Sequence, residues 1–152
     1  MYDIRKPKEP IFINKESESV VISCDFTNDQ KHILSTTYDG ILNITSLATQ
    51  KFVVKYDNFG HPKTIDSKAL HCCRSIKNHK KVGNTFLVGG ENSMTSVVHF
   101  DANAKYEAWL LEGQAVFDGH SDAIRHVESN ADATLMLSAC ADHSLRIWDM
   151  NT

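Results

Sequence analysis

The chain has 152 residues, a formal net charge of −3 and a hydrophobic content of 41%, which is typical of a globular protein of about one domain. Sixteen basic residues against nineteen acidic ones leave no basic excess, so nucleic acid is not the expected partner. The apolar runs are far shorter than the roughly 20 residues of a membrane-spanning helix, and the N-terminus lacks the apolar core of a signal peptide. We therefore expect an intracellular protein, cytoplasmic or nuclear, without a membrane partner.

Short runs rich in Val, Ile, Leu, Phe and Thr alternate with turn residues such as Asn, Asp, Gly and Ser along the whole chain, which indicates β-strands. In chain order, the predicted strands are 10–14, 19–25, 32–37, 41–46, 51–55, 69–76, 85–90, 95–100, 114–117, 123–127, 134–139 and 144–149. No segment sustains the period of an amphipathic helix. The predicted fold class is therefore all-β.

The cysteines predict a reduced protein without a metal site. They lie inside strand-like runs and show no C-x-x-C spacing: Cys24, Cys72, Cys73 and Cys140. His71 and His79 flank the central pair, which gives a set of zinc-ligand types. Adjacent residues of a strand point to opposite faces, however, so Cys72 and Cys73 could not easily share one tetrahedral ion. We expect neither a metal nor another cofactor.

An internal repeat becomes visible when two distant segments are superimposed. FTNDQKHILSTTYDGILNITS (26–46) aligns without a gap on SNADATLMLSACADHSLRIWD (129–149), which places Ser35 on Ser138. Both segments have the spacing of two strands joined by a tight turn.

A third segment, 84–101, matches this repeat less closely. Gly89 falls opposite the Ser positions, and Phe100 falls opposite Trp148 if one residue is inserted. The chain thus contains about three units of about four strands each.

The last unit carries the residues of a known repeat. The dipeptide GH at 119–120 is followed by LSACAD and by LRIWD, which ends at Asp149. This pattern resembles the WD40 repeat, whose blades are four-stranded antiparallel sheets around a central channel. The match is strong over 117–149, good over 18–54 and weak over 61–101. The resemblance implies a WD40 β-propeller with about three blades, which is a partial propeller.

The resemblance divides the chain into the end of a preceding blade (1–14), a degenerate repeat (15–56), a degenerate repeat with insertions (57–117) and a well-matched repeat that lacks its last strand (118–152). Propellers close with about four to eight blades. We therefore expect a fragment or truncated product of a larger propeller, or a chain completed by another chain, ahead of a self-contained ring. Unpaired backbone would otherwise be exposed at Ile147 and at Phe12.

Three side chains of the last unit could form a Ser-His-Asp triad, but the resemblance implies a structural role. WD40 blades contain a hydrogen-bonded tetrad, and the matching residues here are His120, Ser138, Asp142 and Trp148. The first unit keeps the partial set Ser35 and Asp39, with Thr45 at the Trp position and Ser17 at the His position. Because Ser138 lies in a regular strand without the G-x-S-x-G elbow of a hydrolase, we expect no enzymatic activity.

The resemblance also implies a partner-binding face, lined by residues at the start of the innermost strand and before the turn Asp. The residues at these positions are Ala123, Arg125, Ala141, Val20, Ile22 and Tyr38. Arg and Tyr favour interaction hot spots, so we expect a scaffold or adaptor for protein partners. An alternative is a substrate receptor of a cullin-RING ubiquitin ligase, because YDIR at 2–5 resembles the signature in which the Arg, here Arg5, contacts the adaptor. A propeller-hosted hydrolase is the alternative from another class.

Overall fold

The computed structural model describes residues 10–56, 68–77, 84–100 and 115–151. These residues form β-strands and no helix, which confirms the all-β class for the described part of the chain. The strands are β1 (Val21–Phe26), β2 (His32–Thr37), β3 (Leu42–Ser46), β4 (Phe52–Tyr56), β5 (Leu70–Ile76), β6 (Asn84–Gly90), β7 (Thr95–Phe100), β8 (Ala115–Phe117), β9 (Ile124–Ser129), β10 (Leu135–Cys140) and β11 (Leu145–Asp149). A helix able to cross a membrane is absent from this part of the chain.

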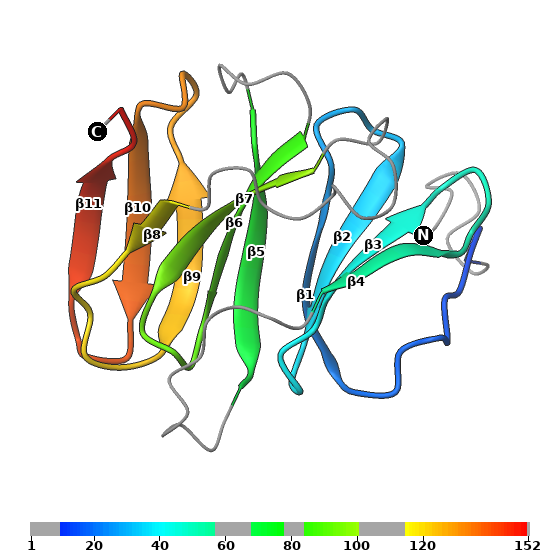
Figure 1. Ribbon diagram of the computed structural model, residues 1–152, viewed down its shortest axis with the longest axis horizontal. Helices are drawn as coiled ribbons and strands as arrows, with labels where there is room; N and C mark the ends of the chain where they lie inside the picture. Colours follow the sequence, from blue (N-terminus) through cyan, green and yellow to red (C-terminus); the bar gives the residue numbers. More distant parts are fainter. Residues whose placement is uncertain (1–9, 57–67, 78–83, 101–114, 152) are drawn as a thin grey trace.

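Three antiparallel sheets stand side by side (Figure 1). The first sheet has the strand order β1-β2-β3-β4, the second β5-β6-β7-β8 and the third β9-β10-β11. The leading strands β1, β5 and β9 lie against one another in sequence order. This is the arrangement of consecutive propeller blades, whose innermost strands line the centre.

The first and third sheets have the same pairing register. Ser35 pairs with Asn43 across β2 and β3, and Ser138 pairs with Arg146 across β10 and β11, so the gapless alignment of the two segments is confirmed. The turns also match, because the residue with left-handed backbone is Gly40 (φ 86°) in one and His143 (φ 66°) in the other. Glycine enters this conformation without strain, whereas His143 has a side chain that opposes it.

The second sheet follows the same plan without an insertion. Its β6–β7 turn is as long as the matching turns of the other sheets, and Ser93 (φ 58°) has the left-handed backbone. Val88 and Val98 therefore stand where the third sheet has its Ser and its Trp. The predicted placement of Gly89 and Phe100 at these positions is wrong, because two valines replace the polar residues that guide the alignment.

The predicted strand at 10–14 is also wrong. Pro10 forms an isolated bridge, and residues 11–20 form no strand. Alternating apolar residues favour a strand only where a neighbouring strand offers hydrogen bonds, and Pro10 itself has no N–H to donate. This segment instead lies along the first sheet, where the Glu16 carboxylate accepts a hydrogen bond from the Phe52 backbone N–H at 3.3 Å.

Two apolar layers hold the three sheets together. Between the first and second sheets, Leu34, Leu42, Ile44, Phe86, Val88, Val98 and Phe100 are among the buried residues. Between the second and third sheets, they include Leu87, Val97, Ile124, Val127 and Met136. Successive residues of β6 enter alternate layers, so every residue of this strand is buried. The second sheet is therefore covered on both faces by its neighbours.

Candidate functional site

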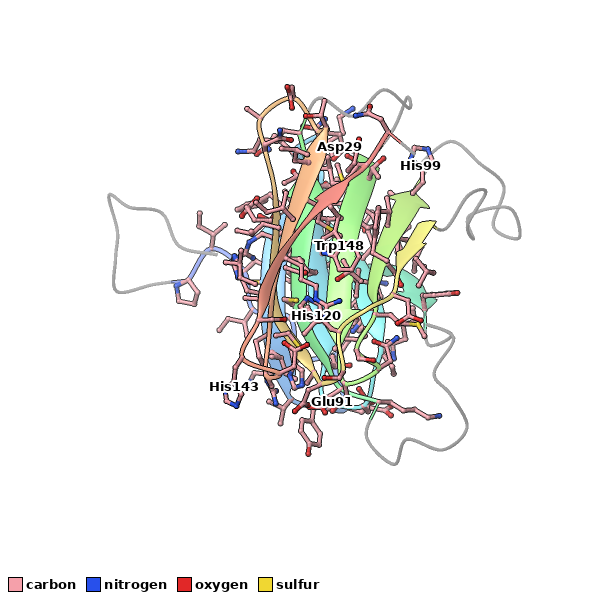
Figure 2. The ribbon with its side chains drawn as sticks, turned by 90° about the vertical axis from the view of Figure 1, so that its left-hand side faces the viewer. Asp29, Glu91, His99, His120, His143 and Trp148 are labelled. Carbon is pink, nitrogen blue, oxygen red and sulfur yellow. The ribbon has the colours of Figure 1, made fainter. Side chains whose placement is uncertain are left out.

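Four side chains of the third sheet form one chain of hydrogen bonds. The His120 Nδ1 lies 2.9 Å from the Asp142 carboxylate, and the His120 Nε2 lies 2.7 Å from the Ser138 hydroxyl. Trp148 donates its Nε1–H to the same hydroxyl at 2.8 Å. With Nδ1 protonated toward the carboxylate, Nε2 accepts from Ser138, whose oxygen then accepts from the indole. Figure 2 labels His120 and Trp148 near each other on this sheet. Their rings meet edge to face, with the ring centroids 6.0 Å apart.

The Asp142 carboxylate is held in its ionised form. The hydrogen bond from the Ser144 hydroxyl at 2.6 Å lowers its pKa most, and burial opposes this effect. His120 and the backbone N–H of Ser121 lower the pKa further, and the result lies well below the ordinary range of an aspartate. An ionised Asp142 fixes the tautomer of His120 and thereby the direction of the whole chain of bonds.

The tetrad offers no nucleophile to a substrate. The Ser138 side chain is fully buried, and its oxygen already has two partners. A hydrolase needs a serine that a substrate carbonyl can approach beside an oxyanion hole. The geometry instead ties the segment before β9 to β10 and β11, which is a structural task.

The first sheet does not assemble the corresponding set. Asp39 accepts a hydrogen bond from the Thr37 hydroxyl, and within the described residues no hydrogen bond joins Asp39 to Ser35. Thr37 also accepts from the Ile41 backbone N–H at 3.0 Å, so the turn is closed locally.

A charged cluster lies at one end of the sheets and joins the second sheet to the third. The Arg125 Nη1 is 2.7 Å from the His71 Nε2 and 3.5 Å from the Glu91 carboxylate. The His71 Nε2 also contacts the Glu91 carboxylate directly. The Arg125 side chain remains 52% exposed, whereas the other two are largely covered. We call these three residues the blade-end cluster.

Sequence reasoning found one member of the blade-end cluster and missed two. One backbone hydrogen bond marks the same position in all three sheets: Tyr38 N to Val20 O at 3.0 Å, Glu91 N to Ala69 O at 2.9 Å, and Ala141 N to Ala123 O at 2.9 Å. Glu91 therefore holds in the second sheet the position that was predicted at Tyr38 and Ala141. His71 correspondingly holds the position of Arg125. The turn ENS at 91–93 aligns with ADH at 141–143, which is a sequence signal for the position of Glu91 but not for its contact with Arg125.

The other predicted binding residues differ in accessibility. Val20 and Tyr38 are 69% and 60% exposed, Arg125 is exposed, and Ile22 and Ala141 are partly exposed. Ala123 is fully buried in this structure, so its side chain is not part of the exposed surface. Arg5 lies outside the described residues.

Figure 2 labels Glu91 and His143 at one end of the sheets and Asp29 at the other. At the Asp29 end, a second contact clamps the first sheet to the second. The Asp29 N–H donates to the Asn84 side-chain oxygen, and the Asn84 amide donates back to the Asp29 carboxylate, both at 2.9 Å. Burial raises the pKa of Asp29, but hydrogen bonds from Thr27, Lys31 and Asn84 outweigh it and lower the pKa to about 2.

The cysteines and histidines that could hold a metal ion were compared with their positions in the structure. Cys72 and Cys73 enter different apolar layers, and burial raises the pKa of each thiol to about 12. His79 lies outside the described residues. Among the described residues, ligand atoms of His120, Cys140 and Asp142 lie within 4.8 Å of one another. The first and last of these bond to each other in the tetrad, and the Cys140 thiol donates to a backbone carbonyl at 3.0 Å.

Comparison with known proteins finds a family match for the part of the chain that contains the third sheet. Residues 112–149 match the family described as WD domain, G-beta repeat. The chain is 29% identical over 122 residues to a ribosome biogenesis protein WDR12 homolog from Caenorhabditis briggsae, covering 78% of this chain and 24% of that protein. It is 26% identical over 175 residues to a WD repeat-containing protein 55 homolog from Aedes aegypti, covering 99% of this chain and 37% of that protein. The chain thus spans well under half the length of either relative.

Solved structures show the same fold at low sequence identity. A structure of U3-55K superimposes with a TM-score of 0.68 and 17% identity, covering 90% of this chain and 38% of that one. A crystal structure of RRP9 WD40 repeats superimposes with a TM-score of 0.68 and 16% identity, covering 90% of this chain and 37% of that one. These similarities concern the arrangement of the sheets.

Proposed function

This chain belongs to the WD40-repeat β-propeller family, and on that premise we propose that it is a non-catalytic scaffold that binds a protein partner at the end of the sheets carrying the blade-end cluster. The observation that carries the proposal is the convergence of Arg125 with His71 and Glu91 across two sheets. A guanidinium that is held in place at one nitrogen and exposed elsewhere is prepared to bind a partner's carboxylate.

Exposed apolar side chains flank this charge. Val20 and Tyr38 are exposed on the first sheet, where Tyr38 holds the position of Glu91 and its backbone N–H bonds to the Val20 carbonyl. Burial of an aromatic ring and an aliphatic side chain around a charge-assisted hydrogen bond is the usual composition of a protein hot spot. The surface therefore fits a protein segment that carries an acidic residue beside an apolar one.

The relatives suggest the cellular setting of this scaffold. The name of the Caenorhabditis briggsae protein assigns it to ribosome biogenesis. We propose that this chain works in the same setting, in the nucleus, as a subunit that holds proteins of a ribonucleoprotein assembly together. Its near-neutral charge favours contact through protein partners over direct contact with RNA.

Affinity purification of the tagged chain tests the proposal. Arg125→Glu and Tyr38→Ala should each remove the same co-purifying proteins, because both lie on the proposed surface. Lys51→Glu is the matched control, since Lys51 is exposed in the turn beside Lys31, at the Asp29 end. It should retain all partners. Unchanged partner recovery with both surface variants, at unchanged circular dichroism, would contradict the proposal.

A further inference from the structure

His71 is the central group of the blade-end cluster, and its Nε2 atom faces two groups of opposite kind. The Arg125 Nη1, which can only donate a hydrogen bond, lies 2.7 Å away. The Glu91 carboxylate, which as an ion can only accept, contacts the same ring nitrogen. A ring nitrogen carries either a lone pair or a hydrogen, so Nε2 can accept from Arg125 or donate to Glu91 but cannot do both.

The protonation of His71 therefore selects its partner. When Nε2 is unprotonated, it accepts from Arg125, and the guanidinium of the third sheet is tied to the second sheet. When the ring is protonated, the imidazolium donates to the Glu91 carboxylate, and both groups belong to the second sheet. The guanidinium then loses its acceptor and faces a like charge at 2.7 Å, which favours its movement away from the ring.

The exposure of the three side chains fits this exchange of partners. His71 and Glu91 are 12% and 25% exposed, so water competes little for the bond between them. Arg125 is 52% exposed, so water can bond to its guanidinium once His71 no longer accepts from it. The covered pair can thus stay together while the exposed side chain moves.

The other ionisable side chains on the strands packed against β5 have partners elsewhere or lie in solvent. Strands β1, β2, β6 and β9 lie against β5, and β6 carries no ionisable side chain. The side chains in question are Asp25, which accepts from the Ser75 backbone N–H, His32, which bonds to Asp29, Glu128, which pairs with Arg74, and the exposed Cys24 and His126. Among the described residues, Glu91 and Arg125 are thus the charged groups that bond to His71.

We propose that His71 is a protonation switch that ties Arg125 to the second sheet when its Nε2 is unprotonated and releases Arg125 when the ring is protonated. For its consequence, the regulation of partner binding, this inference rests on the proposed function. A released arginine has to be immobilised again before it can hold a partner's carboxylate, which weakens binding by about five-fold. The positive charge gained by His71 is balanced by the Glu91 carboxylate beside it, so the main change for a partner is the freedom of Arg125.

Nuclear magnetic resonance of the 13C,15N-labelled chain tests the switch without a partner. Between about pH 8 and about pH 5, the range in which histidine titrates, the ring nitrogens of His71 should report protonation of Nε2. The side-chain Cζ signal of Arg125 should move with the same midpoint. His71→Gln should make the Arg125 signal independent of pH, because the amide oxygen accepts from Arg125 while the amide nitrogen donates to Glu91.

His126→Gln serves as the control for this titration. His126 is exposed, ionisable and adjacent to Arg125 in β9, but it is not part of the cluster. This variant should leave the titration of the Arg125 signal unchanged. An Arg125 signal that stays fixed while His71 titrates would overturn the proposal. So would an Arg125 signal that still moves in His71→Gln.

Affinity purification of the tagged chain at about pH 8 and about pH 5.5 tests the consequence for binding. Recovery of the proteins that Arg125→Glu removes should fall about five-fold at the lower pH, and His71→Gln should retain them at both. An equal fall in the unsubstituted chain and in His71→Gln would overturn the regulatory role. If the Arg125 signal follows His71 but recovery is the same at both pH values, the switch is supported and the proposed binding surface is contradicted.

Discussion

Replacement of Ser138 by Ala should destabilise the chain, because the Ser138 hydroxyl is the central group of the tetrad. It accepts the indole N–H of Trp148 at 2.8 Å and donates to the His120 Nε2 at 2.7 Å. The substitution removes both bonds but keeps the Cβ atom. Packing around β10 is therefore nearly unchanged, and the loss of stability reports the hydrogen bonds.

The expected loss is about 2–3 kcal/mol. A net hydrogen bond stabilises a fold by about 1 kcal/mol, and a buried group left without its partner costs about 1–3 kcal/mol. The indole of Trp148 is only half-buried and can bond to water instead. The His120 side chain is fully buried, and among the described residues its Nε2 bonds only to Ser138, so most of the loss arises there.

Urea denaturation followed by far-UV circular dichroism measures the effect. With a slope of about 2 kcal/mol per molar urea, the midpoint should fall by about 1 M. Ser35→Ala is the matched control, because Ser35 has the same strand position without hydrogen-bond partners among the described residues, and it should change stability by less than about 0.5 kcal/mol. Equal losses for the two variants would refute the assignment of stability to the tetrad.

Three further predictions concern pH, a turn and thiol reactivity. The pKa of Asp29 is about 2 when folded and near its ordinary value of about 4 when unfolded, so its stabilising effect is complete above pH 4 and is lost toward pH 2. The pH dependence of urea midpoints should accordingly be weaker in Asp29→Asn. Gly40→Ala should lower stability by about 2 kcal/mol, because the backbone is left-handed and the new Cβ would lie 2.5 Å from the Lys68 carbonyl oxygen; His143→Gly, a change at the equivalent position, should not. In native protein, Ellman's reagent should modify the exposed Cys24 while Cys73, buried with a pKa of about 12, reacts only after unfolding.

Sequence reasoning located the third sheet well because its blade retains polar residues at each of the four tetrad positions. The same reasoning misplaced residues in the second sheet, where Val88 and Val98 replace the polar pair and leave only a generic strand pattern. Valines at these positions pack into an apolar layer, which many registers would satisfy equally well. The structure fixes the register through the turn at Ser93, a feature that one sequence does not reveal.

The blade-end cluster could not be derived from the sequence for a different reason. Arg125 was placed by its position in a recognised repeat, but its partners His71 and Glu91 belong to a degenerate one. Their contact depends on β5 and β9 lying side by side, which follows from the stacking of sheets and not from either repeat alone. A site formed between two repeats is visible only when both registers are known.

The residues at the Trp148 position stabilise the three sheets in three different ways. Trp148 fills its position and closes a hydrogen-bond chain, so the third sheet is stabilised from within. Val98 fills its position with apolar contacts to the first sheet, which joins two sheets but provides no polar group. Thr45 is buried at its position without closing a hydrogen-bond chain, and the first sheet is held by the contact between Asp29 and Asn84 and by the bonds of its own turn. Loss of the tetrad in a blade therefore removes one source of stability, and contacts between neighbouring sheets have to supply it instead.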